Sequence, residues 1–556
     1  MPTKAQLSYP PSEDPPPVND ERSLMLAAAK KLGLDPESII AARASRVSFD
    51  ARRRHRVWRV SVDVWTTGDE HPPERGTDPP TYSEPLSDAL HTVVIGSGPA
   101  GLFCALDLMS EGINVTVLER GRDVQTRRKP IAKLHRGEAV DPNSNYCFGE
   151  GGAGTYSDGK LYTRSGRKKD IRGVLETLVA HGASEEILSS WRPHVGSNRL
   201  PEVVAAMRET ILRSGGKVRF GSLAEEIETD PSSRAITAVH TRDLDTDSVE
   251  RIACDAIVLA TGHSAMDALE MAARAGATLE PKGFAMGVRI EHPQPWLDEG
   301  QYGGLRAENS LPASFYELTT EVRERGVYSF CMCPGGFIVP TTVAPNRHVL
   351  NGMSLSRRDS PYANSGIVVS IEPEDWCGER AREWGFDKLM ASSSDQHPIP
   401  ENPGDDPLFG VRLQHALEER AAVLGGGANR APSQRADIVA EGSSQPGPAL
   451  TTSYRPGVTP IDLADLFPQG MLLRLRAALP DFEKRISGFS SEIGQLLGVE
   501  SRTSSPVRIA RDPESYQALP ILNLYPCGEG AGFAGGIVSA AIDGRRIAAA
   551  ISNSRV

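Results

Sequence analysis

Three glycines with the spacing of a dinucleotide-binding turn lie in the stretch HTVVIGSGPAGLFCALDLMSEGINVTVLER, residues 91–120. They are Gly96, Gly98 and Gly101, between an apolar run and a segment with helical spacing. In such a turn the first glycine allows the sharp bend, the second lets a pyrophosphate approach the backbone, and the third lets helix and strand pack closely. N–H groups at the start of a helix beginning near Pro99 would face the phosphates. The stretch therefore predicts strand, turn, helix and strand around a bound dinucleotide.

An acid, Glu119, ends the second expected strand, where a carboxylate can accept hydrogen bonds from ribose hydroxyls. An acid there would repel a 2′-phosphate, so the nucleotide is predicted to be FAD or NAD rather than NADP. A glycine-rich turn without a ligand is the alternative, because a lone motif of this kind is a weak signal. The strand, the helix and the acid at the required spacing favour the ligand.

Further glycines follow at three places in the chain. The stretch FGEGGAGTYSDGKLY, residues 148–162, suggests backbone amides lying against the ligand, with an ordinary flexible loop as the alternative. The sequence ATG at Ala260 to Gly262 ends a buried apolar strand. From Leu522 to Ile551 the chain again predicts strand, glycine turn and amphipathic helix. The dinucleotide domain is therefore expected to be completed by the end of the chain.

Two thiols stand two residues apart in YSFCMCPGG, Tyr328 to Gly336. Along a strand Cys331 and Cys333 would point to one face, with Met332 opposite. They give only two ligands, and no His or Cys pair at metal-like spacing completes a tetrahedral set, so no metal site is expected. Packing is the favoured role, because free cysteine is often buried. The alternative is contact with flavin or substrate, which would require a cation or a helix start to lower a thiol pKa.

Composition limits the classes of protein. At 556 residues two or three domains are expected. The net charge of −11 argues against a nucleic-acid-binding surface over the whole protein, although local basic patches are compatible with it. There is no apolar run near the ~18 to 20 residues of a membrane span and no apolar signal core at the start, which predicts a soluble, cytoplasmic protein. The odd number of cysteines, 7, indicates reduced thiols rather than a disulfide framework.

The predicted fold class is α/β: a discontinuous Rossmann-type domain with an inserted mixed β/α substrate domain and a small N-terminal α+β module. The module's basic cluster, Arg52 to Arg54 and Arg56, is better explained by a solvated hairpin turn than by an anionic partner. The expected ranges are a disordered tail at 1–20, the module at 21–66, a linker at 67–88, the dinucleotide domain at 89–282 and 505–556, and the insertion at 283–504.

Local patterns predict several elements. Residues 217–229 are expected to form one strand with a short following turn, then a two-stranded meander that returns to the parallel sheet at Ala256 to Ala260. Residues 284–371 are strand-rich, and Leu408 to Leu424 is helical. Residues 425–457 are mostly irregular, and the GGG there follows a helix rather than a strand, so it is not a second nucleotide turn. Helical segments are expected at 463–486 and at SSEIGQLLG, residues 490–498.

Eight motifs of this chain resemble a family of largely uncharacterised FAD-dependent dehydrogenases of bacteria and plastids. They are GSGPAGL, FGEGGAGTYSDGKLY, VLATGHSAMD, YSFCMCPGGF, NGMS, GGGANRAPSQR, ESRTSSPVRI and CGEGAGFAGGIVSAAIDG. These belong to the glutathione reductase-like two-domain flavoproteins. The resemblance covers about residues 21–551. It implies that FAD is bound through the first glycine turn and its acid, and that Gly528, Glu529, Gly535 and Gly536 contact the ribityl chain and flavin ring. Many relatives carry aspartate at the position of Glu529, and either carboxylate accepts from a hydroxyl. Residues 436–457 look less like the relatives.

The favoured function is an FAD-dependent dehydrogenase or reductase acting on a small organic substrate at the flavin face. NAD(P)H would be a transient donor without a fold of its own, and another electron-transfer partner is the alternative. A flavin monooxygenase or oxidase is the runner-up, but ATGHSAMD stands where such enzymes usually carry a DG-type motif with an arginine. A flavin-bound RNA- or partner-binding protein using residues 21–66 is the third reading. The expected catalytic residues are Cys331 and Cys333. The expected cofactor-binding residues are Gly96, Gly98, Pro99, Ala100, Gly101, Glu119, Arg120, Gly149, Gly151, Gly152, Gly154, Ser157, Lys160, Ala224, Thr261, Gly262, Gly528, Glu529, Gly535, Gly536 and Ile537.

Overall fold

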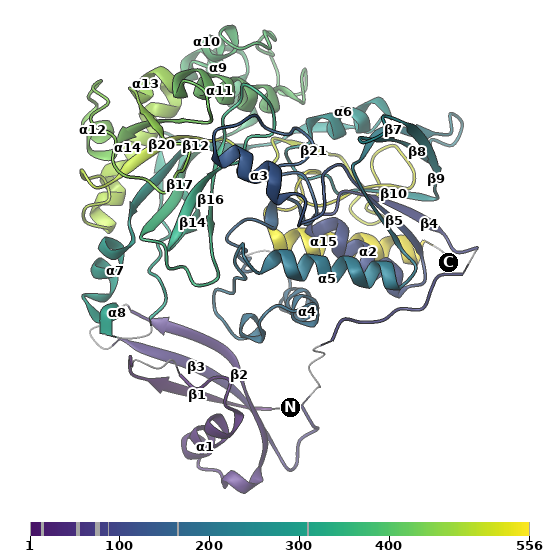
Figure 1. Ribbon diagram of the computed structural model, residues 1–556, viewed down its shortest axis with the longest axis vertical. Helices are drawn as coiled ribbons and strands as arrows, with labels where there is room; N and C mark the ends of the chain where they lie inside the picture. Colours follow the sequence, from purple (N-terminus) through teal and green to yellow (C-terminus); the bar gives the residue numbers. More distant parts are fainter. Residues whose placement is uncertain are drawn as a thin grey trace.

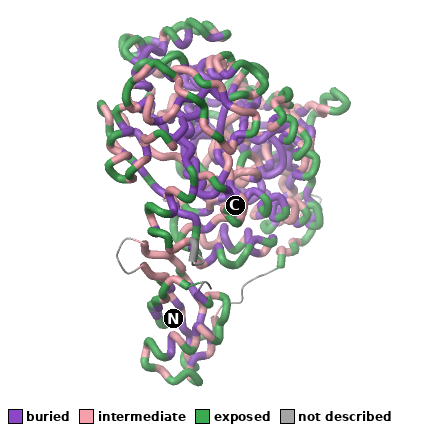
Figure 2. The backbone as a smooth tube through the Cα atoms, turned by 60° about the vertical axis from the view of Figure 1, so that its left-hand side comes forward, coloured by how far each residue is buried: buried purple, intermediate pink, exposed green. Residues whose placement is uncertain are grey.

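A small N-terminal module lies below a larger body in the computed structural model (Figure 1). The structure describes residues 2–12, 16–51, 56–72, 78–86, 88–163, 166–308 and 311–554. Arg52 to Arg54 of the predicted basic turn lie outside these ranges. Buried backbone fills the centre of the body, and the module has a smaller buried centre of its own (Figure 2). Among the described residues no helix combines the length and the apolar character needed to cross a bilayer.

The module is a three-stranded antiparallel sheet with one helix across it. Its elements are β1 (Thr3–Tyr9), α1 (Glu21–Leu32), β2 (Ile39–Asp50) and β3 (Val57–Thr66), in the strand order β1-β3-β2. The prediction that residues 1–20 are disordered is wrong for Thr3–Tyr9, which pairs with β3 along its whole length. The alternate residues Ala5 and Leu7 are buried there. The alternating pattern of this strand is hard to recognise in the sequence because it is short and a proline-rich segment follows it. The helix α1 and the strands β2 and β3 agree with the predicted α+β module.

A five-stranded parallel sheet forms the centre of the larger body. Its order is β22-β10-β4-β5-β6. The inner strands β4, β5 and β10 are short, rich in valine and isoleucine and buried on both faces, as parallel strands covered on two sides must be. Alternate residues face two different cores, one shared with α2, α4, α5 and α15 and one shared with α6 and a β-meander. The predicted Rossmann-type fold is confirmed. The bounds are β4 (His91–Ile95), β5 (Asn114–Glu119), β6 (Lys217–Phe220), β10 (Ala256–Leu259), β22 (Leu524–Pro526), α2 (Pro99–Ser110), α4 (Lys168–Ala180), α5 (Leu200–Arg213), α6 (Met266–Arg274) and α15 (Ile537–Asn553).

The segment at 217–229 is two strands rather than one. β6 belongs to the parallel sheet, and after Gly221, whose φ is 65°, the chain enters β7 (Ser222–Thr229) of an antiparallel meander with β8 (Ile236–Asp243) and β9 (Val249–Ala253). The glycine lets the chain change sheets at one residue, because a positive φ is strained for other residues. The return to the parallel sheet at β10 is as predicted.

A seven-stranded sheet in the inserted region lies beside the parallel sheet (Figure 1), in the order β13-β14-β17-β12-β20-β18-β19. Two long helices, α11 (Phe409–Gly425) and α14 (Gln469–Arg485), pack over it. The strands are β12 (Phe284–Pro293), β13 (Thr319–Val322), β14 (Arg325–Cys333), β17 (Tyr362–Ile371), β18 (Ala431–Arg435), β19 (Val458–Pro460) and β20 (Gln495–Glu500). The smaller elements are α3 (Arg128–His135), β11 (Leu279–Pro281), α7 (Gln294–Tyr302), α8 (Leu305–Glu308), β15 (Gly336–Pro340), β16 (Leu350–Ser354), α9 (Gly378–Trp384), α10 (Phe386–Ala391), α12 (Ala436–Glu441), α13 (Leu463–Leu466) and β21 (Val507–Ile509).

One helix prediction in this region is wrong. The end of SSEIGQLLG is not helical, because Gln495–Glu500 is the buried strand β20 between β12 and β18. A short apolar run does not distinguish helix from buried strand, and pairing with neighbours decided it here. Residues 425–457 are mostly irregular, as predicted, but they also contain β18 and α12. The helix predicted at 408–424 is confirmed as α11, so the GGG follows a helix as expected.

Candidate flavin site

A cavity of about 220 Å³ lies where β4, β5, β10 and β22 end at the edge of the parallel sheet. This is the edge at which open α/β sheets bind ligands. The structure brings together here most residues predicted from scattered motifs: Gly96, Gly98, Pro99, Ala100, Glu119, Arg120, Gly152, Gly154, Ser157, Ala224, Thr261, Gly262, Cys331, Glu529, Gly536 and Ile537. It does not place Gly101, Gly149, Gly151, Lys160, Cys333, Gly528 or Gly535 in the wall.

The three glycines of the first turn occupy three different environments. A Cβ on Gly96 would lie 2.4 Å from the Ala260 carbonyl oxygen, and one on Gly101 would lie 2.0 Å from the Gly96 carbonyl oxygen. A Cβ on Gly98 would find no protein atom nearer than 3.9 Å, at the Cα of Gly152. Two glycines are therefore required by packing, whereas the middle one faces free space in the cavity. The residues present fit a dinucleotide whose pyrophosphate lies against Gly98.

The carboxylate of Glu119 is buried and already accepts four hydrogen bonds from the protein. One oxygen accepts from the backbone and hydroxyl of Ser97, at 3.0 and 2.8 Å, and the other accepts from the amides of Gly121 and Gly149, at 2.9 and 3.0 Å. These fill the roughly four acceptor positions of an ionised carboxylate. Glu119 therefore ties the first glycine turn to the second glycine stretch, and a ribose hydroxyl would have to share or replace one of these donors.

The second glycine stretch is shaped by a buried arginine that the sequence did not single out. Arg127 is fully buried and donates to four carbonyls in and just before the stretch, those of Asn145, Tyr146, Glu150 and Gly152, at 2.7 to 2.9 Å. A Cβ on Gly149 would lie 2.5 Å from the Arg127 side chain. This glycine is needed for packing against Arg127 rather than for contact with the cavity. Nothing in the local sequence marks Arg127, because its partners lie 18 to 25 residues away.

The two thiols of β14 meet a lysine from the second glycine stretch. Lys160 Nζ lies 3.6 Å from Cys331 Sγ and 3.5 Å from Cys333 Sγ, and it is also 3.3 Å from the buried carboxylate of Asp158. Cys331 is half-buried and lines the cavity, whereas Cys333 is fully buried. The strand is irregular between Phe330 and Cys333, yet both sulfurs reach the same ammonium. Lys160, predicted to contact the cofactor, lies instead behind the thiols.

The charges around the thiol pair favour ionisation of Cys331. A hydrogen bond from the Cys333 thiol, with the positive charges of Lys160 and Arg289, holds the pKa of Cys331 well below its usual range, although burial opposes this. The same hydrogen bond and burial raise the pKa of Cys333. Such a difference between adjacent thiols gives a nucleophilic or basic sulfur on the cavity wall and a proton donor behind it.

Two further carboxylates lie around the cavity. Glu529 Oε2 is 3.4 Å from Nδ1 of His263, and both residues line the wall. Glu500 is fully buried and paired with Arg289, which also donates to the Cys331 carbonyl oxygen at 2.7 Å. Burial raises the pKa of Glu500 to about 7 despite the arginine. Among the described residues no group of three or more His, Cys, Asp or Glu side chains could hold a metal ion.

Comparison with known proteins agrees with this geometry. Residues 90–283 match the pyridine nucleotide-disulphide oxidoreductase family and residues 283–503 match the FAD-dependent protein, C-terminal domain-like family, while residues 1–65 match a domain of unknown function. A protein of Clostridium beijerinckii, described as uncharacterized, is 37% identical over 536 residues and is covered over 93% of each chain. The chain belongs to this family of FAD-dependent oxidoreductases.

Solved structures give more distant likenesses to this FAD-dependent oxidoreductase. A geranylgeranyl bacteriochlorophyll reductase-like protein from Thermoplasma acidophilum is 10% identical with a TM-score of 0.35, over 84% of this chain and 79% of that one. CtdE in complex with FAD is 12% identical with a TM-score of 0.31, over 84% of each chain. The prediction that the chain binds FAD is supported by the family. The role of NAD(P)H, the domain boundaries and the individual contacts to FAD stay predictions.

Proposed function

We propose that this FAD-dependent oxidoreductase is a dehydrogenase or reductase that acts on a small organic substrate beside Cys331. When bound, FAD supplies hydride or one-electron chemistry. The observation that carries the proposal is the contact of Lys160 with the thiol of Cys331, which is itself in the cavity wall. A thiol held ionised at that place is a group that can take up or return a substrate proton.

The roles of the chain's own residues follow from their positions. Gly98 and the start of α2 would hold the pyrophosphate, and Glu119 would hold the turn and share its acceptors with the ribose. Cys331 would hold the proton that the substrate gives up on oxidation or receives on reduction. Cys333 and Lys160 would be positioning residues, because they touch the Cys331 sulfur rather than the cavity.

The cofactor half of the proposal is tested by Gly98→Ala. A methyl group would occupy the space left for the pyrophosphate, so the purified variant should lose most of its noncovalent FAD, read from the flavin absorbance. Gly300→Ala is the matched control, because a Cβ there would meet no protein atom within 4 Å, and Gly300 lies in α7, outside the cavity. Full FAD content in Gly98→Ala protein would contradict the assignment.

The reaction class is tested by anaerobic mixing with NADH and with NADPH while following the flavin absorbance. Bleaching by either nucleotide supports a reductase with a nicotinamide donor. If neither bleaches the flavin, the electrons come from the substrate or from another protein. Oxygen consumption with a reducing substrate would then identify an oxidase.

The thiol half is tested with Cys331→Ser and Cys333→Ser. We expect Cys331→Ser to lower turnover, or the rate of nicotinamide-driven reduction, by about a hundredfold or more with normal FAD content, since positioned acid–base groups contribute about that much. Cys333→Ser keeps a hydrogen-bond donor to the Cys331 sulfur, so its pH profile should not move upward, whereas Cys333→Ala removes the donor and should shift the pH profile of the rate upward. Cys377→Ser, a buried thiol outside the cavity, is the control. Full rates in both variants would leave the thiols as packing groups.

A further inference from the structure

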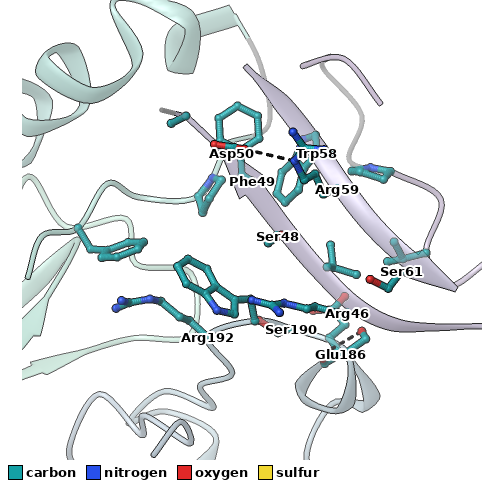
Figure 3. A pocket seen from close by; sticks show the side chains of 18 of the residues that line it. Arg46, Ser48, Phe49, Asp50, Trp58, Arg59, Ser61, Glu186, Ser190 and Arg192 are labelled. Atoms are coloured by element: carbon teal, nitrogen blue, oxygen red, sulfur yellow. Dashed lines mark hydrogen bonds and ion pairs between the residues drawn. The ribbon is translucent and has the colours of Figure 1, made fainter. Parts of the chain in front are cut away.

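A second and larger cavity, of about 840 Å³, lies between the N-terminal module and the body. It shares no lining residue with the flavin cavity. Figure 3 shows Ser48, Phe49 and Trp58 on the module's strands on one side and Ser190 and Arg192 of the body on the other. Its volume is within the range of about 300 to 1,000 Å³ that is usual for small-molecule sites. We call this cavity the module cleft.

Backbone hydrogen bonds hold the two sides of the module cleft in place. Val47 of β2 donates to the Ser189 carbonyl oxygen at 2.7 Å and accepts from the Trp191 amide at 3.0 Å, which forms a parallel bridge between module and body. Phe49 of the same strand packs edge-on against Tyr302 of α7, with centroids 5.7 Å apart. The cleft is therefore preformed, and a ligand would not have to order its walls.

The chemistry of the walls is aromatic and cationic. Trp191 remains 45% exposed, a large apolar side chain presented to the cleft. The guanidinium carbon of Arg46 lies 5.8 Å from the centroid of this indole, and that of Arg192 lies 4.9 Å from it and 3.9 Å from the ring of Phe315. Two arginines thus face one exposed indole. Flat ligands that stack on such rings and carry negative charge suit this wall.

The two arginines differ in their partners. Arg192 forms an ion pair with Glu317 at 2.8 Å. Arg46 is exposed and, within the part of the chain that the structure describes, has no acidic group at ion-pair distance. Arg46 therefore offers its charge to a ligand. Two acids also line the cleft: Asp50 pairs with Arg59 at 3.2 Å, and Glu186 adds a negative charge that would repel a long polyanion such as nucleic acid.

We propose that the module cleft binds a planar aromatic ligand with a single anionic group, such as a carboxylate or sulfonate, with its ring against Trp191 and its anion at Arg46. This site is separate from the flavin cavity, and it gives the N-terminal module a function in ligand binding. Its lining residues include Arg358, which pairs with Asp158 at 3.2 Å. The same carboxylate pairs with Lys160, so two ion pairs connect this wall of the cleft to the lysine beside the thiols.

The test uses the full-length, FAD-loaded protein and isothermal titration calorimetry with two probes. Naphthalene-2-sulfonate carries the ring and the charge, and naphthalene-2-sulfonamide carries the same ring without the charge. We expect saturable binding of one sulfonate per chain and about tenfold weaker binding of the sulfonamide, since one charge-assisted hydrogen bond corresponds to about that factor.

Variants then locate the binding. Arg46→Ala should weaken the sulfonate about tenfold and leave the sulfonamide unchanged, whereas Trp191→Leu should weaken both probes. Arg43→Ala is the matched control, because Arg43 is on the same strand but stacks on Trp65 and does not line the cleft. It should bind both probes as the wild type does. FAD content is recorded in parallel, so a failed flavin assignment is distinguishable from a failed cleft assignment.

Three results would overturn the proposal. The first is no saturable binding of the sulfonate at millimolar concentration. The second is equal affinity for the two probes, or equal binding by Arg46→Ala and Arg43→Ala protein. The third is tight, salt-dependent binding of decauridylate that Arg46→Ala abolishes while the sulfonate does not bind, which would assign the cleft to single-stranded RNA instead.

Discussion

Two buried arginine–glutamate pairs flank the flavin cavity. They consist of the same residue types, but the pKa of the glutamate is lowered in one pair and raised in the other. Arg502 holds Glu418 with two hydrogen bonds of 2.8 Å, and the Ser501 hydroxyl adds a third at 2.7 Å. This pairing outweighs burial and lowers the pKa of Glu418 to about 2. Burial alone therefore does not decide the charge of a carboxylate here.

The second pair, Arg289 with Glu500, has a different geometry. Arg289 divides its donors among Glu500, the Asn364 and Asn351 side chains and the Cys331 carbonyl oxygen. Oε1 of Glu500 is buried and has no hydrogen-bond partner among the described residues. The pKa of Glu500 is raised to about 7, first by burial. A fully satisfied pair is a structural clamp, whereas a partly satisfied pair beside a thiol can change its charge near neutral pH.

The largest effect is expected from breaking the satisfied pair with Arg502→Leu. The change leaves the buried Glu418 charge with the Ser501 hydroxyl as its remaining hydrogen-bond donor, and it should lower the free energy of unfolding by about 3–5 kcal/mol. Urea unfolding at saturating FAD measures it. The double variant with Glu418→Leu should recover much of the loss, because both charges are then gone. A single-variant cost below about 1 kcal/mol would show that the pair is not a clamp.

The next largest effect is the pH dependence of stability that the pair of Arg289 and Glu500 should cause. Because the folded pKa of Glu500 is raised from about 4.5 to about 7, the folded state keeps a proton that the unfolded state releases. Stability should therefore fall as pH rises through this window, by about 2 kcal/mol between about pH 5 and pH 8. Glu500→Gln should remove this fall, as measured by unfolding at a series of pH values.

The pair of Arg502 and Glu418 is the control, because its contribution to stability should depend on pH in the opposite direction. The folded pKa of Glu418 is depressed to about 2, so its stabilisation is present above the ordinary pKa of about 4.5 and is lost as pH falls toward 2. Glu418→Gln should change the acid side of the stability curve and leave the window of Glu500 unchanged. Parallel curves for the two glutamine variants would contradict the difference between the pairs.

A smaller effect is expected at the thiols, which lie beside the pair of Arg289 and Glu500. Lys160→Met removes the ammonium that contacts both sulfurs, so the apparent pKa of Cys331 should rise, as read from the pH dependence of the ultraviolet thiolate absorbance. Asp158 keeps its ion pair with Arg358, which limits the structural damage. Lys217→Met, an exposed lysine on β6, is the control. An unchanged thiol pKa would show that Lys160 does not act on Cys331.

The smallest effect tests the third donor of the clamp. Ser501→Ala removes the hydroxyl that donates to Glu418 at 2.7 Å and should cost about 1 kcal/mol, because both arginine hydrogen bonds remain. The same measurement as for Arg502→Leu applies. A cost as large as that of the arginine variant would mean that the hydroxyl, rather than the guanidinium, compensates for burial of the charge.

The sequence by itself determined the features that depend on neighbouring residues. The glycine spacing, the acid 23 residues after Gly96 and the β-branched strands predict the Rossmann-type sheet and the cofactor class, because a dinucleotide turn is a local structure. The sequence did not predict the strands Thr3–Tyr9 and Gln495–Glu500. Their apolar patterns are too short to distinguish a strand from a disordered or helical segment, and pairing with a neighbouring strand determines their structure.

Only the tertiary structure decided which charged groups meet. Lys160 reaches Cys331 across 171 residues of sequence, Arg289 reaches Glu500 across 211, and Arg127 gathers carbonyls from a stretch that carries no sign of it. The same holds for the module cleft, whose Arg46 and Trp191 come from different parts of the chain. These contacts set the thiol and carboxylate pKa values, and sequence spacing cannot reveal them because folding, rather than proximity along the chain, creates the low-dielectric surroundings in which each charge finds its partner.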